Sequence, residues 1–144
     1  MLGMTKRQFL KRSKKSLNET GTLLLLLKDT MNKINQEKIS NEEASKQINN
    51  IRIEVESIFS QFEKNDPPSR CTPLKGRILH VLIILHESVI ATLESLTAAR
   101  KENEEKSRNK WNESNHILEE FSKDFHPICD DVNSFLVKKQ KKEN

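Results

Sequence analysis

The fold is decided most clearly by residues 40–64, which read SNEEASKQINNIRIEVESIFSQFEK. Ser40 and Glu43 match a capping box, in which each side chain accepts a hydrogen bond from a backbone amide at the start of a helix. The sequence after Lys64 then turns to Asn-Asp-Pro-Pro, and proline cannot continue a helix. We therefore predict a helix over residues 41–64. Its apolar side chains recur at alternating steps of four and three residues, which keeps one face apolar: Ala44, Ile48, Ile51, Val55, Ile58 and Phe62.

Two further helices are predicted downstream by the same periodicity. Thr72-Pro73 combines a capping residue with proline at the first helical position, and apolar steps from Leu74 onward predict a helix over 73–103. The sequence near 100–108 has neither glycine nor proline, so we place the next turn there because an unbroken helix would be about 100 Å long. A stripe from Trp111 to Phe135 predicts the last helix over 108–138, with a kink at Pro127.

The first helix is indicated by a seven-residue repeat at Leu10, Leu17, Leu24 and Met31. It predicts a helix over 5–38 that passes through Gly21, and the alternative is a flexible basic arm over residues 1–20. Four helices joined by short connections predict an all-α, antiparallel up-down four-helix bundle with coiled-coil-like contacts. We expect one domain over 1–144, with residues 139–144 as a basic disordered tail.

Composition excludes several other classes of protein. The 144 residues are 34% hydrophobic and 32% charged, with three glycines, four prolines and no tyrosine. Barrels and sandwiches favour aromatic and β-branched strands with glycine-rich turns, and phosphate-binding loops need glycine. This composition instead suits helices with an apolar face and a charged back.

The chain has no recognisable targeting pattern. Its basic start is long, and the apolar run that follows, Leu23–Leu27, is shorter than the roughly 7–15 residues of a secretory signal. No apolar run approaches the ~20 residues of a membrane span, so we expect a cytoplasmic protein without a transmembrane segment. Cys71 and Cys129 are too few and too far apart for a disulfide framework, which predicts free thiols.

Basic residues concentrate at the two ends of the chain. Because antiparallel helices in even number bring both ends to one pole, we expect a basic pole there, joined by Arg70, Lys75 and Arg77. Such a pole could bind an anion, and nucleic-acid binding is the alternative function. Phe9 is the only aromatic residue among these bases, so base stacking has little support. The candidate anion-binding residues are Lys6, Arg7, Lys11, Arg12, Lys14, Lys15, Lys138, Lys139, Lys141 and Lys142.

Motifs that would carry chemistry are incomplete. His86-Glu87 begins like the zinc-protease pattern HExxH, but Ile90 stands where the second histidine is needed. The pair Glu113 and His116 is a single copy of the Glu-x-x-His pattern that di-iron bundles use twice. Cys129 lies in a predicted helix interior, where the backbone amides that an oxyanion site needs are already bonded. We therefore predict no catalytic residue, no metal site and no cofactor, and an enzyme is not expected.

One resemblance follows from the order of these features. A Pro67-Pro68 pair, a histidine-bearing apolar helix with His80 and His86, a polar stretch Ala98-Ala99-Arg-Lys-Glu and a final helix follow one another. Over residues 40–138 this order resembles small four-helix-bundle proteins of unknown function from low-GC Gram-positive bacteria. The resemblance implies the bundle and no activity.

The third predicted helix is apolar on more than one face. Leu79, Ile83 and Ile90 fall outside the arc of its core residues, and a second apolar face must be covered by something. We interpret these residues as an interaction surface for a protein partner or a second copy of the chain. The alternative is that neighbouring helices cover them. The expected function is thus non-enzymatic protein–protein interaction or regulation.

Overall fold

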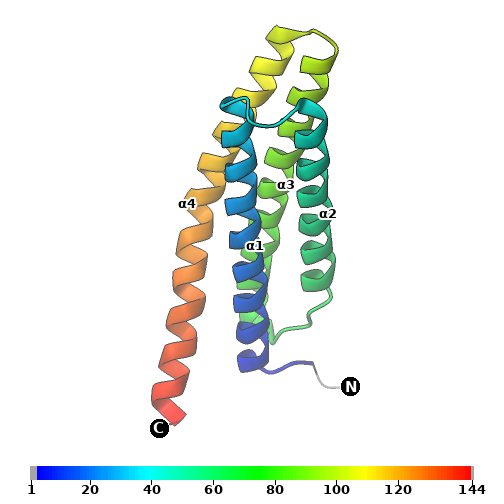
Figure 1. The fold of residues 1–144 in the computed structure, drawn as a ribbon. Helices are drawn as coiled ribbons and strands as arrows, with labels where there is room; N and C mark the ends of the chain where they lie inside the picture. The colour runs from blue at the N-terminus through cyan, green and yellow to red at the C-terminus, as the bar shows by residue number, and fades with distance from the viewer. Residues whose placement is uncertain (1–2, 144) are drawn as a thin grey trace.

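The computed structural model describes residues 3–143, with side chains described through Lys138. It contains four helices, α1 (Lys6–Asn35), α2 (Asn41–Glu63), α3 (Thr72–Arg100) and α4 (Glu104–Glu143), and the described residues form no strand. A short 3-10 turn, η1 (Ser69–Cys71), precedes α3. Consecutive helices pack against each other in antiparallel order, and α4 also contacts α1 (Figure 1). The predicted antiparallel four-helix bundle is confirmed.

The N-terminal half of α1 is helical, including the basic residues and Gly21. Thr5 caps this helix, because its hydroxyl accepts from the Gln8 amide at 3.1 Å while the Gln8 side chain accepts from the Thr5 amide at 2.9 Å. In α2 the Ser40 hydroxyl accepts from the Glu43 amide at 3.1 Å, which is the first half of the predicted capping box. Helices α1 and α2 therefore begin where side chains satisfy unpaired amides of the first turn.

The α1–α2 and α3–α4 connections, which lie at the pole opposite the start of α1, contain no glycine. Each uses a glutamate with positive φ, Glu37 at 55° and Glu102 at 59°. The turn between α3 and α4 occupies residues 101–103, and the Asn103 side chain accepts from the Lys106 amide at 3.1 Å. The predicted start of the last helix at residue 108 is thus four residues too late. Glutamate in the left-handed region is uncommon, so the sequence carried no ordinary signal for this turn.

The start of α3 differs from its prediction by one residue. Cys71, and not Thr72, is the N-cap, and its side chain makes no capping hydrogen bond. The reason is that η1 runs directly into the helix, with the Cys71 amide donating to the Pro68 carbonyl at 2.8 Å. Pro73 still lies in the first turn, where its missing amide costs nothing.

Helix α3 is the central helix, because it has more buried residues than any other described helix and packs mainly against α4 and α2. Small polar residues let it approach α4 closely. The Ser88 hydroxyl donates to the Ser114 carbonyl at 3.1 Å, and the Ser114 hydroxyl donates to the Ser88 carbonyl at 3.0 Å. Thr92 Oγ1 lies 2.7 Å from Ser114 Oγ in the same buried cluster. A second such contact joins Ser95 Oγ to the Ser107 carbonyl at 2.7 Å.

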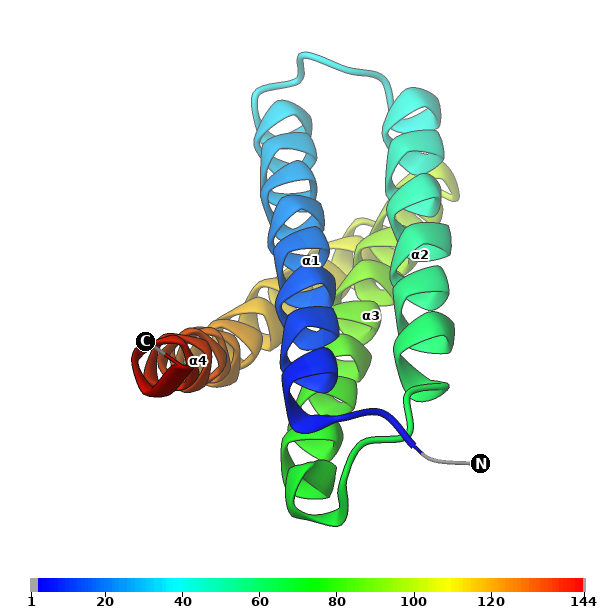
Figure 2. The same cartoon turned by 90° about the horizontal axis from the view of Figure 1, so that it is seen from below.

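Helix α4 is inclined to α1 and α2 (Figure 2). Gly21 lies at the approach of α1 to α4, where an added Cβ would stand 3.7 Å from the Phe125 ring. The helix continues without a break across Pro127. Phe135, which the stripe predicted as a core residue, is 39% exposed because α4 has diverged from the bundle at this level.

By length and composition alone, the segment Ser69–Arg100 could cross a membrane. However, 56% of its most apolar window is buried inside the fold. Packing against the other helices buries that share of the window.

Candidate interaction surface

An exposed strip of α3 lies between its contacts with α2 and its contacts with α4, and we call it the α3 face. It contains the three predicted residues: Ile83 is 44% exposed, while Leu79 and Ile90 are half-buried. The flanking helices therefore cover part of this row and leave Ile83 open. Phe59 of α2, which is half-buried, borders the same strip beside Ile83. The apolar period of α2 did not mark Phe59 as a site residue, because Phe59 falls beside the apolar stripe of that helix.

Two recesses adjoin the α3 face. The first, of about 290 Å³, is lined by residues of α2 and α3: Val55, Glu56, Phe59, Ser60, Leu82, Ile83 and His86. The second, of about 440 Å³, lies farther along α3 toward the α3–α4 turn and is lined by Ile90, Leu93, Glu94, Thr97, Ala98, Lys101, Asn103 and Lys106. The α3 face thus has protruding apolar side chains with recesses beside them. Side chains of another helix can fill such recesses.

Charged groups form a small cluster where the middle of the α3 face borders α2. Glu56 of α2 accepts from Arg52 Nη1 at 2.6 Å and lies 3.3 Å from His86 Nε2. Partial desolvation raises the pKa of the Glu56 carboxyl, but the hydrogen bonds from His86 and Arg52 outweigh it and leave the pKa below its usual value. The i, i+4 spacing of Arg52 and Glu56 was the sequence signal for this pair. Glu87 is exposed next to His86.

The start of α1 and the end of α4 lie at one pole of the bundle (Figure 1), the arrangement predicted for the two ends of the chain. Lys6 Nζ stands 5.5 Å from the centroid of the Phe135 ring, which joins the start of α1 to the end of α4. Arg12 Nη1 donates to the Asn65 side chain at 3.1 Å. Two predicted members of this pole therefore hold internal contacts.

Other cations expected at this pole are also engaged within the fold. Lys75 Nζ donates to the carbonyls of Glu63 and Asn65 at 2.8 and 2.7 Å, where it satisfies the end of α2. Arg77 pairs with Asp131 at 3.0 Å. Arg70 is exposed and Arg7 is half-buried. The structure exposes Lys11, Lys14, Lys15 and Lys138, and the side chains of Lys139, Lys141 and Lys142 lie outside the described residues.

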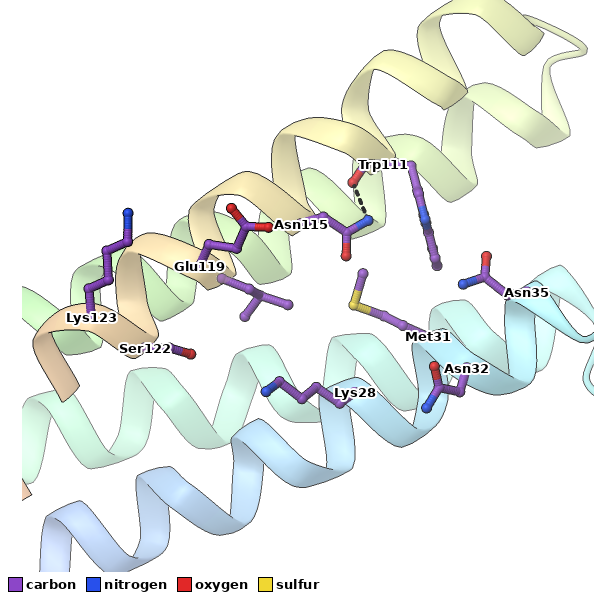
Figure 3. A pocket seen from close by; sticks show the side chains of 10 residues that line it. Lys28, Met31, Asn32, Asn35, Trp111, Asn115, Glu119, Ser122 and Lys123 are labelled. Atoms are coloured by element: carbon purple, nitrogen blue, oxygen red, sulfur yellow. Dashed lines mark hydrogen bonds between the residues drawn. The ribbon is translucent and has the colours of Figure 1, made fainter. Parts of the chain in front are cut away.

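A groove of about 630 Å³ separates the second half of α1 from the first half of α4 (Figure 3). The Trp111 side chain of α4 lies at one end of the groove, and the Met31 side chain of α1 points toward Asn115 (Figure 3). Asn115 Nδ2 donates to the Trp111 carbonyl at 3.2 Å. Lys28 and Lys123 lie toward the other end and do not converge on one point (Figure 3). This arrangement of amides, lysines and apolar atoms contains no focused ligand-binding geometry.

The histidines and cysteines are dispersed. Among residues 3–138 no three His, Cys, Asp or Glu side chains are grouped so that they could hold a metal ion. His116 lies 3.3 Å from Glu120, one turn away on the exposed side of α4. Burial, with a smaller contribution from Asp130, raises the pKa of the Cys129 thiol. A raised pKa lowers the thiolate fraction, the opposite of what an activated nucleophile requires.

No protein-family model, curated protein or solved structure significantly matches this chain. Its class is therefore defined by the fold alone, which is an all-α antiparallel four-helix bundle.

Proposed function

We propose that this protein is a non-enzymatic interaction protein that binds a protein partner through the α3 face. The observation that carries the proposal is the open apolar row on the central helix of the bundle. Leu79, Ile83 and Ile90 recur on one strip of α3, and Ile83 remains 44% exposed after three helices have packed around α3.

The α3 face differs from the other exposed apolar positions of the described chain. Leu25 and Leu26 are 68% and 49% exposed on α1, and Ile53 is 49% exposed on α2. Leu25 and Leu26 are consecutive, so their side chains point about 100° apart and do not form a row along one side of the helix. Leu25 has exposed Thr22 and Asp29 one turn away in each direction on its own helix. Scattered apolar residues of this kind are normal on protein surfaces. A row with adjoining recesses, in contrast, is typical of an interaction site.

Site-specific photo-crosslinking tests the proposal in cells that naturally make the protein. A benzophenone amino acid replaces Ile83 in one variant and Leu25 in a matched control, since both positions are exposed apolar residues of long helices. We expect an adduct of discrete mass from position 83 and none from position 25, because the probe reacts only with a surface held against it. An adduct of twice the chain mass identifies a second copy, and any other mass identifies another protein. Absence of an adduct at 83, or equal adducts at both positions, contradicts the proposal.

Nucleic-acid binding is the second candidate function, and one observation favours it. Lys11, Lys14 and Lys15 recur at three- and four-residue spacing on the outward side of α1 and are all exposed. Three exposed cations on one side of a helix can contact consecutive phosphates of a duplex.

A salt titration checks this second candidate. If the three lysines contact phosphates, log K for nonspecific duplex DNA falls with log[salt] at a slope of about −3. The variant Lys11→Gln, Lys14→Gln, Lys15→Gln is expected to lose nearly all of that slope. Changing three exposed lysines elsewhere provides the charge-matched control: Lys46 in α2, Lys64 directly after α2 and Lys101 directly after α3. An equal loss in both triple variants excludes a specific role for α1.

A further inference from the structure

Helix α1 lies at an edge of the bundle and has one side open to solvent. It stands between α2 and α4, with α3 behind it (Figure 1). At about 100° per residue, the exposed residues between positions 11 and 29 that point away from the core fall within about 65° of one direction. We call them the α1 outer face: Lys11, Lys14, Lys15, Asn18, Thr22, Leu25, Leu26 and Asp29. The face begins with three lysines and reaches two leucines about 20 Å farther along the helix.

The lysines of the α1 outer face are not balanced by acidic groups. Residues 6–18 hold six basic residues and no acidic one. Among the described side chains, Lys11, Lys14 and Lys15 form no ion pair. Lys11 is three and four residues from the other two, a spacing at which like charges repel on a helix. The first turn of α1 also has no acidic residue to balance the helix dipole. An external anionic surface would relieve both effects.

The two exposed leucines indicate which kind of anionic surface fits. Leu25 and Leu26 are 68% and 49% exposed and lie on either side of the outward direction of α1. They form no row that could fit the side chains of a protein. A fluid bilayer needs no such fit, because its hydrocarbon chains rearrange around apolar groups, whereas duplex nucleic acid presents mainly phosphates to a cationic helix. Asp29, the one acid of the face, is paired with Lys33 at 3.2 Å.

We propose that the α1 outer face docks on an anionic lipid bilayer, with its lysines among the headgroups and Leu25 and Leu26 at the boundary of the hydrocarbon. Lysines near anionic headgroups and apolar side chains buried at this boundary both favour binding. The small number of such groups gives weak, reversible binding that requires anionic lipid. The α3 face belongs to a different helix, so this inference does not depend on the protein-binding surface.

Flotation of the full chain with lipid vesicles provides the first test. Vesicles of phosphatidylcholine with about 30% phosphatidylserine should bind the protein, and vesicles of pure phosphatidylcholine should not. Changing all three lysines of the face to glutamine should lower the partition coefficient by about 100-fold, because each loses its attraction to the headgroups. The charge-matched control changes Lys46, Lys64 and Lys101 to glutamine and should lower it by less than about threefold. A wild type that does not bind the anionic vesicles overturns the proposal, and so do equal losses in both triple variants.

The double variant Leu25→Ser, Leu26→Ser tests the apolar part of the face. It should lower the partition coefficient about tenfold, because two side chains no longer enter the hydrocarbon boundary. Ile53→Ser on the outward side of α2 is the apolar control, since Ile53 is 49% exposed, and it should bind like the wild type. If the leucine variant binds as tightly as the wild type, the proposed docking is refuted. Lysine-dependent binding to duplex DNA without binding to vesicles assigns the lysines to nucleic acid and also refutes it.

Thermal unfolding without vesicles separates binding from folding. All substituted residues are exposed, so every variant should keep the helical circular dichroism of the wild type. The triple glutamine variant of the α1 outer face should unfold at the same temperature as the wild type or a higher one, because repulsion between like charges is removed. A clearly lower unfolding temperature would show that these lysines stabilise the bundle, which contradicts their assignment to an external surface.

An environment-sensitive fluorophore tests the orientation of docking. In a Cys129→Ser background, with native Cys71 buried, the label is attached at Leu25→Cys or at Ile53→Cys. Anionic vesicles should shift the emission to shorter wavelength at position 25 and leave it unchanged at position 53. Equal shifts at both positions contradict docking through α1. A photo-adduct between position 25 and a lipid changes the mass of the chain very little, so Leu25 remains a valid control for protein partners.

Discussion

Replacing Phe121 with alanine is expected to lower the free energy of unfolding by about 3–5 kcal/mol. Phe121 is fully buried, and its ring stacks on Phe125 with centroids 4.8 Å apart. Alanine removes this apolar area and leaves a cavity between α4 and the neighbouring helices, which the surrounding side chains can fill only in part. Urea denaturation followed by fluorescence measures the loss. Trp111 is the only tryptophan and the chain has no tyrosine, so the signal reports one site.

Phe135→Ala is the matched control on the same helix. Its ring is 39% exposed and contacts Lys6 Nζ at 5.5 Å. We expect a loss of at most about 1 kcal/mol, the size of an exposed cation–π contact with little burial. Similar losses for the two phenylalanines would show that α4 is buried equally along its length, contrary to the divergence seen in Figure 1.

Replacing Ser114 with leucine is expected to destabilise the bundle by about 3 kcal/mol. Ser114 is fully buried, and its hydroxyl lies 3.0 Å from the Ser88 carbonyl and 2.7 Å from Thr92 Oγ1. A leucine side chain has no room there, so α3 and α4 must separate or strain. The substitution also removes the Ser114 hydroxyl of α4, which is a hydrogen-bonding partner of Thr92 on α3. Thermal and urea unfolding of the variant measure both effects together.

Ser114→Ala separates the space requirement from the hydrogen bonds. Alanine fits, and the Ser88 hydroxyl can still donate to the Ser114 carbonyl, while Thr92 Oγ1 can still donate to the Ser88 carbonyl at 3.0 Å. The expected loss is therefore about 1 kcal/mol. If alanine proves as damaging as leucine, the hydroxyl network and not the close approach of the helices stabilises this interface.

The secondary structure followed from local signals. The spacing of Ala44, Ile48 and Ile51 predicted α2, because 3.6 residues per turn bring these side chains to one face whatever that face contacts. Ser40 marked the beginning of α2 because its hydroxyl bonds to an amide three residues away. In contrast, Glu102 gave no warning of a turn, because glutamate is uncommon in the left-handed region. Local hydrogen bonds at the end of α3 accompany this conformation, from the Glu102 amide to the Ala99 carbonyl and from the Asn103 amide to the Ala98 carbonyl.

The candidate site was predicted only in part. Periodicity placed Leu79, Ile83 and Ile90 outside the core arc of α3. The exposed fraction of each of these side chains depends on how closely α2 and α4 approach α3. That distance is not determined by residues that are neighbours in the sequence. The basic pole shows the same limit. Charge distribution and an even helix number predicted its position, yet side-chain geometry committed Lys75 to the end of α2 and Arg77 to Asp131.

The sequence by itself determined four helices, their antiparallel order and the position of the chain ends, because each depends on hydrophobic period, capping and connection length, which are local properties. Only the tertiary structure decided that α3 is central, that Ser88 and Ser114 bring α4 against it, and that α4 diverges so far that Phe135 is exposed. These features depend on the shapes of facing side chains from distant parts of the chain. Helix angle and spacing follow from how those shapes interdigitate.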